Sequence, residues 1–333
     1  MTKAVLLHFM LNKRDIIERM NCLGKESKPF LFCVDFEMDN GFVVENPFSQ
    51  QDILFDLNSV SNFMSSSSVV DSSSSSLISF PRSFEAYDSQ FDVVRRGLLR
   101  GDSFLANLTI KTKIDINISL EEIFLRANSK YRLLVRDRFV CFSPECFVRI
   151  EDNTISTFPM KGTIDSSVEN AREVILNDYK ETCEHNTIVD LMRNDLNIIG
   201  SNVRVERFRY IDELKTSRGN ILQVSSEVKA DLNCDFYSQL GDIVFKLLPA
   251  GSISGAPKES TVNIIKEAEK EKRGFYTGVF GFFDGHNMDS AVIIRYIEKE
   301  GNNHYFRSGG GVTVNSCSRD EYQEAINKIY LPF

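Results

Sequence analysis

The sequence of residues 275–314, FYTGVFGFFDGHNMDSAVIIRYIEKEGNNHYFRSGGGVTV, decides the fold class. It holds three apolar runs and two turn signals: 275–283, 290–297 and 305–314, with Asp284-Gly285 and Gly301-Asn302 between them. Short turns of this composition join neighbouring strands of an antiparallel sheet. The stretch therefore predicts a β-meander of three strands.

Helical patterns and one further strand surround this meander. The spacing of apolar residues predicts helices at 12–22 and 91–99 and a buried strand at 29–36. Two capping-box matches, Ser166-x-x-Glu169 and Ser318-x-x-Glu321, predict a long helix from 166 towards 196 and a final helix. Pro257 predicts the start of another helix. Strands and helices mixed in this way predict an α+β fold with antiparallel sheets.

The composition is that of an ordinary globular protein. The chain has 333 residues, of which 42% are hydrophobic and 26% charged, so it can bury a large core. No segment reaches the roughly 18 uninterrupted apolar residues of a membrane span, and residues 4–10 do not resemble a signal peptide. Residues 65–76 are mostly serine and predict a surface loop. We expect a cytoplasmic protein.

Charge, cysteines and histidines exclude several function classes. A formal net charge of −8 provides no basic surface for nucleic acid or an anionic membrane. The 7 cysteines are scattered without a C-x-x-C spacing, which favours reduced core thiols over zinc or a redox pair. The 4 histidines show no pairing with a serine or cysteine nucleophile, and no cysteine–histidine arrangement for hydrolysing glutamine is evident.

Two pairs of glutamates have the spacing of a metal site. Glu181 with Glu184, and Glu321 with Glu324, place two carboxylates each on one face of a helix. Four such oxygen donors from two helices suit Mg²⁺. The alternative is a solvated helix face, because E-x-x-E is common there, and Glu321 can simply complete its capping box.

Arg295 and a run of glycines indicate a carboxylate site. In the predicted strand Arg295 shares a face with apolar residues, where an unpaired charge costs free energy, and its fork matches a carboxylate. A hairpin centred near Gly301 places residue 307 opposite Arg295 and the segment 308–311 beside it. Glycines allow a ligand to approach backbone amides. The alternative is a bulged strand with a surface arginine.

Two turns carry further candidates. Residues 248–258, LPAGSISGAPK, form a small-residue turn that leads into a helix N-terminus, which can bind an anion or be purely structural. Pro159-Met160-Lys161-Gly162-Thr163 places a lysine in a predicted turn before a helix. A lysine held in this way can act as a nucleophile.

These motifs together resemble the chorismate-utilising enzymes. The matching segments are 159–163, Glu181-x-x-Glu184-His185 with 188–196, 249–258, 308–311 and Glu321-x-x-Glu324, in the same order and spacing over about residues 87–330. Ser143-Pro144-Glu145 matches another element of the family. Lys161 makes the chain resemble most the aminodeoxychorismate synthase component I branch, because anthranilate synthases typically carry alanine at this position.

The resemblance implies a fold and a domain organisation. It implies two large antiparallel sheets packed together with helices outside. The chain is expected to form a single catalytic domain over 1–333, with a core at 87–330 and a shortened, divergent N-terminal part at 1–85. The short N-terminal part lacks the segment that forms a tryptophan site in longer relatives.

The resemblance also implies a set of site residues. Mg²⁺ would be held directly by Glu184 and Glu324, with Glu181 and Glu321 acting through waters. The substrate carboxylate would be bound by the following groups: Arg295, Tyr276, the amides of Gly309, Gly310 and Gly311, and Ser252 and Lys328. Lys161 would attack ring carbon C2 of chorismate while Glu145 protonates the leaving C4 hydroxyl. Ammonia would then attack C4 and expel the lysine, giving 4-amino-4-deoxychorismate.

One departure and one absence refine this picture. Family members that eliminate pyruvate carry a histidine shortly before a V-S segment, and alignment on Val224-Ser225 places Leu222 there. Because the chain shows no amidotransferase triad, the resemblance implies a separate glutamine amidotransferase subunit (component II) as the ammonia source. The alternatives are an anthranilate synthase component I, a non-catalytic chorismate-binding subunit, and an isochorismate or salicylate synthase.

Overall fold

The fold is built from two large antiparallel sheets, described here from a computed structural model of residues 10–63, 75–216 and 219–333. The first has 10 strands within the described residues: β1 (Leu11–Asn12), β3 (Asn40–Glu45), β2 (Phe30–Val34), β16 (Val279–Phe283), β17 (Met288–Val292), β10 (Cys146–Glu151), β11 (Thr154–Thr157), β14 (Gly219–Asp231) and β12 (Met160–Asp165), with β13 (Ser201–Thr216) also paired to β14. Every pairing in it is antiparallel.

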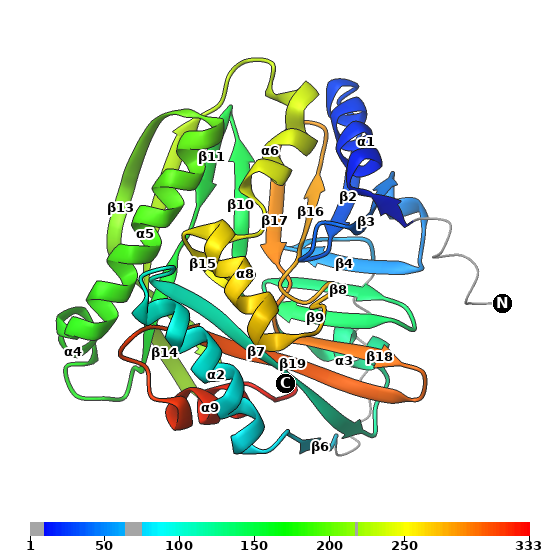
Figure 1. The fold of residues 1–333 in the computed structure, drawn as a ribbon. Coiled ribbons are helices and arrows are strands. Elements are labelled where there is room, and N and C mark those ends of the chain that lie inside the picture. The colour runs from blue at the N-terminus through cyan, green and yellow to red at the C-terminus, as the bar shows by residue number, and fades with distance from the viewer. Residues whose placement is uncertain (1–9, 64–74, 217–218) are drawn as a thin grey trace.

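The second sheet has 9 strands in the same described part of the chain. They are β15 (Gly255–Ala256), β7 (Leu105–Ile116), β19 (Asn303–Val312), β18 (Tyr296–Glu300), β9 (Phe139–Ser143), β8 (Tyr131–Val135), β4 (Ile53–Leu57) and β5 (Val60–Ser61), with β6 (Leu77–Phe80) beside β7. In Figure 1 its strands run across the view while those of the first sheet run from top to bottom. The predicted α+β class with two antiparallel sheets is confirmed.

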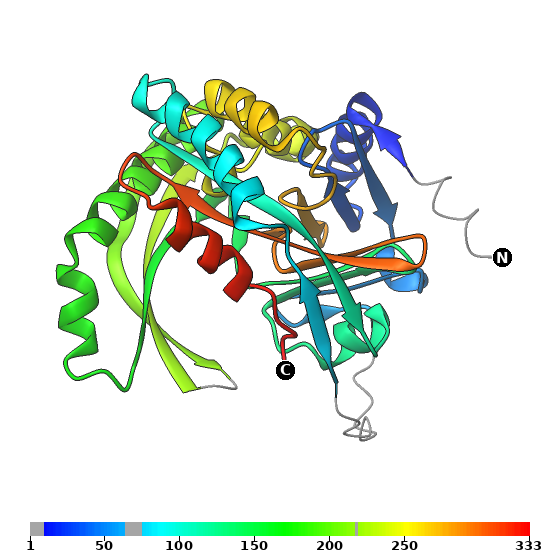
Figure 2. The same ribbon diagram turned by 60° about the horizontal axis from the view of Figure 1, so that its bottom comes forward.

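Helices cover the outer faces of the sheets. The α-helices are α1 (Lys13–Lys25), α2 (Phe84–Leu99), α3 (Leu120–Arg126), α4 (Ala171–Asn177), α5 (Tyr179–Ile199), α6 (Leu240–Leu247), α7 (Gly251–Ser254), α8 (Lys258–Glu269) and α9 (Ser318–Asn327), with 3₁₀ turns at Pro47–Ser49 and Phe236–Gln239. In Figure 2, α2 and α9 lie along β7 and β19, while α4 and α5 lie against the sheet that holds β12 and β14. None of the described helices is long and apolar enough to cross a membrane.

The sheets pack face to face around an apolar core. One cluster of buried side chains joins Leu31 and Phe280 of the first sheet to Phe55, Leu133 and Phe139 of the second. A second cluster lies between the first sheet and helices α1, α5 and α6, and a third joins α2, α8 and α9 to β7 and β19. Burial of this apolar area is the main stabilising contribution to such a fold.

The C-terminal meander differs from its prediction at one point. The predicted strand 290–297 is two strands, because β17 ends at Val292 in the first sheet and β18 begins at Tyr296 in the second. Arg295 lies in the link between them with a φ of 54°. The prediction failed because 290–297 is mostly apolar and reads as one strand, although its two ends are buried in different sheets. The strand at 275–283 also begins later, at Val279.

The helix predicted from Ser166 is also wrong at its start. Residues Met160–Asp165 form strand β12, and Asp165 Oδ1 accepts hydrogen bonds from the backbone and hydroxyl of Ser167, which fixes a turn instead of a capping box. The long helix α5 begins after Asp178, whose side chain accepts from the Glu181 amide. Lys161 is therefore a strand residue, not a turn residue before a helix.

The remaining helix predictions hold with small changes. Helix α1 confirms 12–22, α2 contains 91–99, and Pro257 is the cap residue of α8. Helix α9 begins at Ser318, but the Ser318 hydroxyl binds Asp88 and no side chain caps the helix. The serine-rich segment 65–76 and residues 4–10 lie almost entirely outside the described residues.

Candidate active site

Glu145 is the group on which the predicted residues converge. It lies in the link between β9 and β10, where its amide binds Ser143 Oγ (3.1 Å) and its carbonyl accepts from the Val292 amide (3.1 Å). The residue is half-buried, yet burial of its carboxyl raises the pKa. A hydrogen bond from Ser252 and the charges of Lys161, Arg295 and Lys328 oppose this shift. A carboxyl whose pKa is raised by burial and that has cations around it suits a general acid.

Lys161 lies in β12 against the end of α5. The register of β12 with β14 shifts between Met160 and Thr163, and Gly162 has a φ of 80°, which only glycine adopts freely. Lys161 Nζ is 3.4 Å from Glu184 Oε2. A Cβ at Gly162 would be 3.2 Å from Glu181 Oε2, so this bulge receives both glutamates of α5.

Strand β19 closes the opposite side of Lys161. A Cβ at Gly311 would be 3.5 Å from Lys161 Nζ, and one at Gly310 would be 3.2 Å from Glu321 Oε2 and 3.3 Å from Glu324 Oε1. The glycines therefore let β12 and α9 approach the strand closely.

The amides of the glycine strand are not equivalent. Lys328 Nζ donates to the Gly309 carbonyl (2.8 Å), and the Thr109 amide opposite it donates to Glu269 instead of to β19. Gly309 therefore directs its backbone groups away from β7, beyond the end of β18, and by alternation Gly311 does the same. The amide of Gly310 faces Leu108 of β7 and belongs to the sheet. Two of the three predicted amides, those of Gly309 and Gly311, thus point away from β7, towards the edge of β19 that lies beyond the end of β18.

Arg295 and Tyr276 approach the same region from the links between the sheets. The left-handed φ of Arg295 takes it out of the strand pattern, and its Nε donates to the Tyr330 hydroxyl (3.1 Å). A guanidinium has five donors, so this bond uses one. Burial raises the pKa of Tyr276 to about 12, against the opposing charges of Arg273 and Arg295. Tyr276 is therefore a neutral hydrogen-bonding group at neutral pH.

The basic residue of the turn at 248–258 is Lys258, and its contacts are structural. Lys258 Nζ binds Asp195 Oδ2 (2.8 Å) and the Leu247 carbonyl (2.6 Å). Its charge is thus neutralised by Asp195, which weakens the anion-binding reading of this helix N-terminus. Ser252 of the same turn forms a hydrogen bond with the Glu145 carboxyl.

His185 has a structural role that the sequence did not indicate. It is buried on α5, and its Nε2 is 2.7 Å from Ser226 Oγ. Ser226 also receives the Arg209 amide and donates its own amide to the Pro159 carbonyl. Burial lowers the pKa of His185 to about 4, so it is neutral. Through Ser226, His185 connects helix α5, which carries Glu181 and Glu184, to the segment that precedes Lys161.

The four carboxylates suit Mg²⁺ by their chemistry. Glu184 and Glu324 are paired with Lys161 (3.4 Å) and Lys328 (2.6 Å), and the oxygens of Glu321 and Glu324 both face Gly310. Within the described residues no three acidic, histidine or cysteine side chains lie close enough together to form a complete metal cage. Mg²⁺ does not require one, since it commonly takes one or two carboxylates with waters and substrate oxygens.

A small cavity borders the acid. It has a volume of about 20 Å³ and is lined by Glu145, Ser252, Thr157, Met192 and Asp195 together with apolar side chains. This volume accommodates one water-sized molecule. The cavity is therefore too small for a ligand larger than water.

Leu222 lies apart from these groups. It is buried in β14 opposite Ile164, three residues beyond Lys161 along β12. Because its side chain is aliphatic, Leu222 can neither donate nor accept a proton there.

The chain is similar in sequence to known proteins. The chain is 47% identical to an uncharacterized PabA-like protein of Haemophilus influenzae, over 100% of this chain and 98% of that protein. It is 30% identical to aminodeoxychorismate synthase component 1 of Bacillus subtilis, over 75% of this chain and 55% of that protein.

Solved structures share the fold. Anthranilate synthase component I of Streptococcus pneumoniae superposes with a TM-score of 0.66 at 28% identity, over 76% of this chain and 58% of that one. The menaquinone-specific isochorismate synthase of Escherichia coli has a TM-score of 0.71 at 14% identity, over 96% and 86%, which shows a shared fold. The sequence profile of the chorismate binding enzymes matches residues 44–332, and the chain belongs to this family.

Proposed function

We propose that the chain is an aminodeoxychorismate synthase component I, which converts chorismate and ammonia to 4-amino-4-deoxychorismate. The observation that carries the proposal is that Lys161 lies between Glu184 of α5 and Gly311 of β19 and that its charge acts on the half-buried carboxyl of Glu145. The similarity to the Bacillus subtilis enzyme supports it.

Substrate binding uses the cations and amides at the edge of β19 that faces away from β7, beyond the end of β18. Arg295, Lys328 and the amides of Gly309 and Gly311 bind a carboxylate of chorismate, and the Tyr276 hydroxyl donates a further hydrogen bond. Lys328 is at present bound to the Gly309 carbonyl and to Glu324, so it must exchange these contacts for the substrate.

Glu184 and Glu324 would hold Mg²⁺, with Glu181 and Glu321 assisting through waters. When bound, Mg²⁺ would offset the negative charge of these side chains and of the substrate carboxylate.

In the first step Lys161 forms a covalent bond with the ring. Its free amine attacks C2, both ring double bonds shift (C1=C2 to C1=C6 and C5=C6 to C4=C5), and the C4–O bond breaks while Glu145 donates its proton, so that the hydroxyl leaves as water. The raised pKa of Glu145 keeps that proton available. Lys161 then carries the ring as a secondary ammonium, and Glu145 is a carboxylate.

In the second step ammonia reverses the shift. It attacks C4, both double bonds return to their first positions, and the C2–N bond breaks to release Lys161 as a free amine. The product amine is formed as an ammonium, and its proton can return to Glu145 or leave with the product. Leu222 fits an enzyme that stops here, because elimination of pyruvate needs a further proton transfer.

The test is identification of the product. The wild-type chain with chorismate, ammonium and Mg²⁺ should give 4-amino-4-deoxychorismate, which an added lyase converts to para-aminobenzoate. Lys161→Ala should abolish this product. Anthranilate formed without a lyase would instead identify an anthranilate synthase, and no turnover of chorismate would support a non-catalytic subunit.

A further inference from the structure

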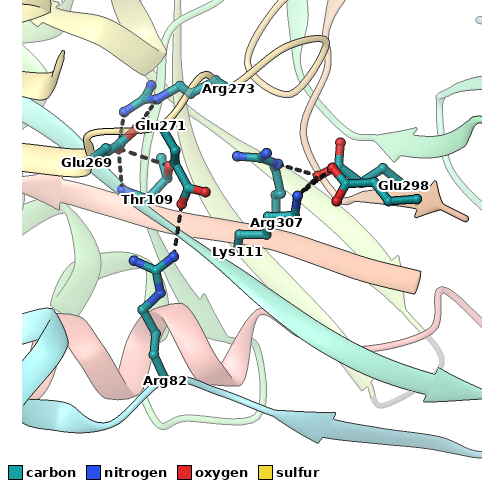
Figure 3. A network of polar contacts seen from close by, with 9 residues as sticks. Arg82, Thr109, Lys111, Glu269, Glu271, Arg273, Glu298 and Arg307 are labelled. Carbon is teal, nitrogen blue, oxygen red and sulfur yellow. Dashed lines mark hydrogen bonds and ion pairs between the residues drawn. The ribbon is translucent and has the colours of Figure 1, made fainter. Parts of the chain in front are cut away.

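A buried ion pair lies behind the proposed site without touching the reacting groups. Arg273 is 1% exposed and Glu269 is 5% exposed. Arg273 Nε is 2.9 Å from Glu269 Oε2, and Nη2 is 2.7 Å from Oε1, a two-pronged contact at the end of α8 (Figure 3). Charges this deeply buried are costly unless every donor and acceptor is satisfied.

The pair holds strand β7 at two points. Arg273 Nη2 donates to the Asn107 carbonyl (2.6 Å), and Glu269 Oε1 accepts from the Thr109 amide (2.8 Å) and hydroxyl (2.9 Å). Asn107 and Thr109 are the partners of Gly311 and Gly309 across the sheet. The ion pair therefore fixes the strand on which the glycine strand rests.

The same guanidinium reaches two other parts of the site. Arg273 Nη1 donates to the Ile253 carbonyl (3.3 Å) and to Thr277 Oγ1 (3.4 Å). Ile253 follows Ser252, which binds Glu145, and Thr277 follows Tyr276. The face of the guanidinium lies 4.5 Å from the ring centre of Phe36.

All five donors of Arg273 are thus used, and each set of contacts ends beside a proposed substrate-binding residue. We propose that Arg273, held by Glu269, is a positioning residue that sets the spacing of the glycine strand, Ser252 and Tyr276 and so determines chorismate affinity. This inference rests on the site named in the proposed function. It assigns Arg273 no contact with substrate.

Lysine cannot replace this arginine. An ammonium has three donors around one point, whereas the guanidinium reaches strand β7, helix α7 and the turn at Thr277 in one plane. In Arg273→Lys the pairing with Glu269 can persist, but the Asn107 and Ile253 carbonyls cannot both be reached. The glycine strand, Ser252 and Tyr276 are then no longer connected through one side chain, while the buried charge of Glu269 remains neutralised by the lysine.

A matched control exists on the far side of the second sheet. Arg132 of β8 is 14% exposed in its side chain, pairs with Asp56 and donates to the carbonyls of Phe124 (3.1 Å) and Ala127 (2.9 Å). It resembles Arg273 in bridging one carboxylate and two backbone carbonyls. Arg132→Lys therefore shows how the loss of such guanidinium contacts changes stability at a position outside the proposed site.

The experiment compares chorismate binding by the two variants, measured by calorimetry with Mg²⁺ and without ammonium in chains that also carry Lys161→Ala and so form no covalent adduct, beside the thermal unfolding of the variants. We expect Arg273→Lys to raise the Kd for chorismate about tenfold or more, and Arg132→Lys to leave it within about twofold at a similar loss of Tm. The KM for ammonium should not change in either. Equal effects of the two variants on the Kd would overturn the proposal.

A second variant decides the matter if Arg273→Lys does not fold. Glu269→Gln retains the shape and can still accept the Thr109 bonds, and it should likewise raise the Kd; an unchanged Kd would contradict the inference. Because binding is measured without ammonium, the comparison is independent of the product formed. A wild-type chain that binds chorismate but makes no 4-amino-4-deoxychorismate would refute the proposed function alone.

Discussion

At the scale of single residues, the account depends on two groups with opposite tasks. Glu145 must keep a proton, and burial of its carboxyl favours the neutral form. Lys161 must lose one and approach a ring carbon. The charge of Lys161 acts on the Glu145 carboxyl, and Ser252 forms a hydrogen bond with the same carboxyl.

Replacement of the acid should separate binding from chemistry. Glu145→Gln retains the shape and the hydrogen bond with Ser252 but cannot protonate a leaving hydroxyl. We expect kcat to fall by about 10²- to 10⁴-fold, with the Kd for chorismate nearly unchanged. Steady-state kinetics and calorimetry check this, and a variant with wild-type kcat would exclude Glu145 as the acid.

The same substitution predicts a pH dependence of stability. A raised folded-state pKa means that the folded chain binds this proton more tightly than the unfolded chain does. The stability associated with Glu145 is therefore complete below the unfolded pKa and is lost as pH rises through the folded value. Glu145→Gln should gain Tm relative to the wild type as the pH rises above the unfolded glutamate pKa of about 4. A constant difference in Tm would show that the carboxyl is not perturbed by folding.

At the scale of elements, the site lies where β12, β19 and α9 meet. Gly310 allows the carboxylates of α9 to lie against the strand, because a Cβ there would be 3.2 Å from Glu321 and 3.3 Å from Glu324. That spacing is tighter than ordinary contact, so any side chain at this position displaces the glutamates.

Gly310→Ala should therefore weaken the response to Mg²⁺. We expect the Mg²⁺ concentration for half-maximal activity to rise about tenfold, while Tm changes little. Gly301→Ala is the control. Gly301 has a φ of 61° and open space around it, so alanine should cost about 1 kcal/mol of stability and leave the Mg²⁺ response alone. Identical Mg²⁺ titrations for Gly310→Ala and the wild type would contradict the assignment.

The elements also show how far the sequence alone could lead. Periodicity and turn signals predicted the antiparallel class, α1, α2 and the start of α8, because these are local signals. The split at Arg295 could not be predicted, because the strands on either side of it join different sheets through contacts distant in sequence. The Ser166 capping box competed with a turn fixed by Asp165.

Arg273 and Glu269 illustrate the limit for site residues. They lie in the segment EAEKEKRG, 267–274, which has the composition of a solvated helix end. Only the fold reveals that two of its charges face inward against β7. Motif order, by contrast, was sufficient to bring together Glu145, Lys161, Glu184 and the glycine strand.

At the scale of the whole molecule, two packed sheets supply a rigid frame for the proposed chemistry, but the chain lacks an evident way to release ammonia from glutamine. A separate glutamine amidotransferase subunit would supply it. We expect amination with ammonium and none with glutamine alone. Glutamine should become effective only when the partner subunit is added, measured as product formed per minute. Glutamine-dependent activity of the chain alone would contradict this.

The most direct measurement is mass spectrometry of the chain after incubation with chorismate and Mg²⁺ without ammonium. The account predicts an adduct with the mass of chorismate less one water on the peptide that contains Lys161, removed on addition of ammonium. Lys161→Ala should carry no adduct. An adduct on another residue, or 4-amino-4-deoxychorismate formed by Lys161→Ala at the wild-type rate, would contradict the central claim that Lys161 is the nucleophile.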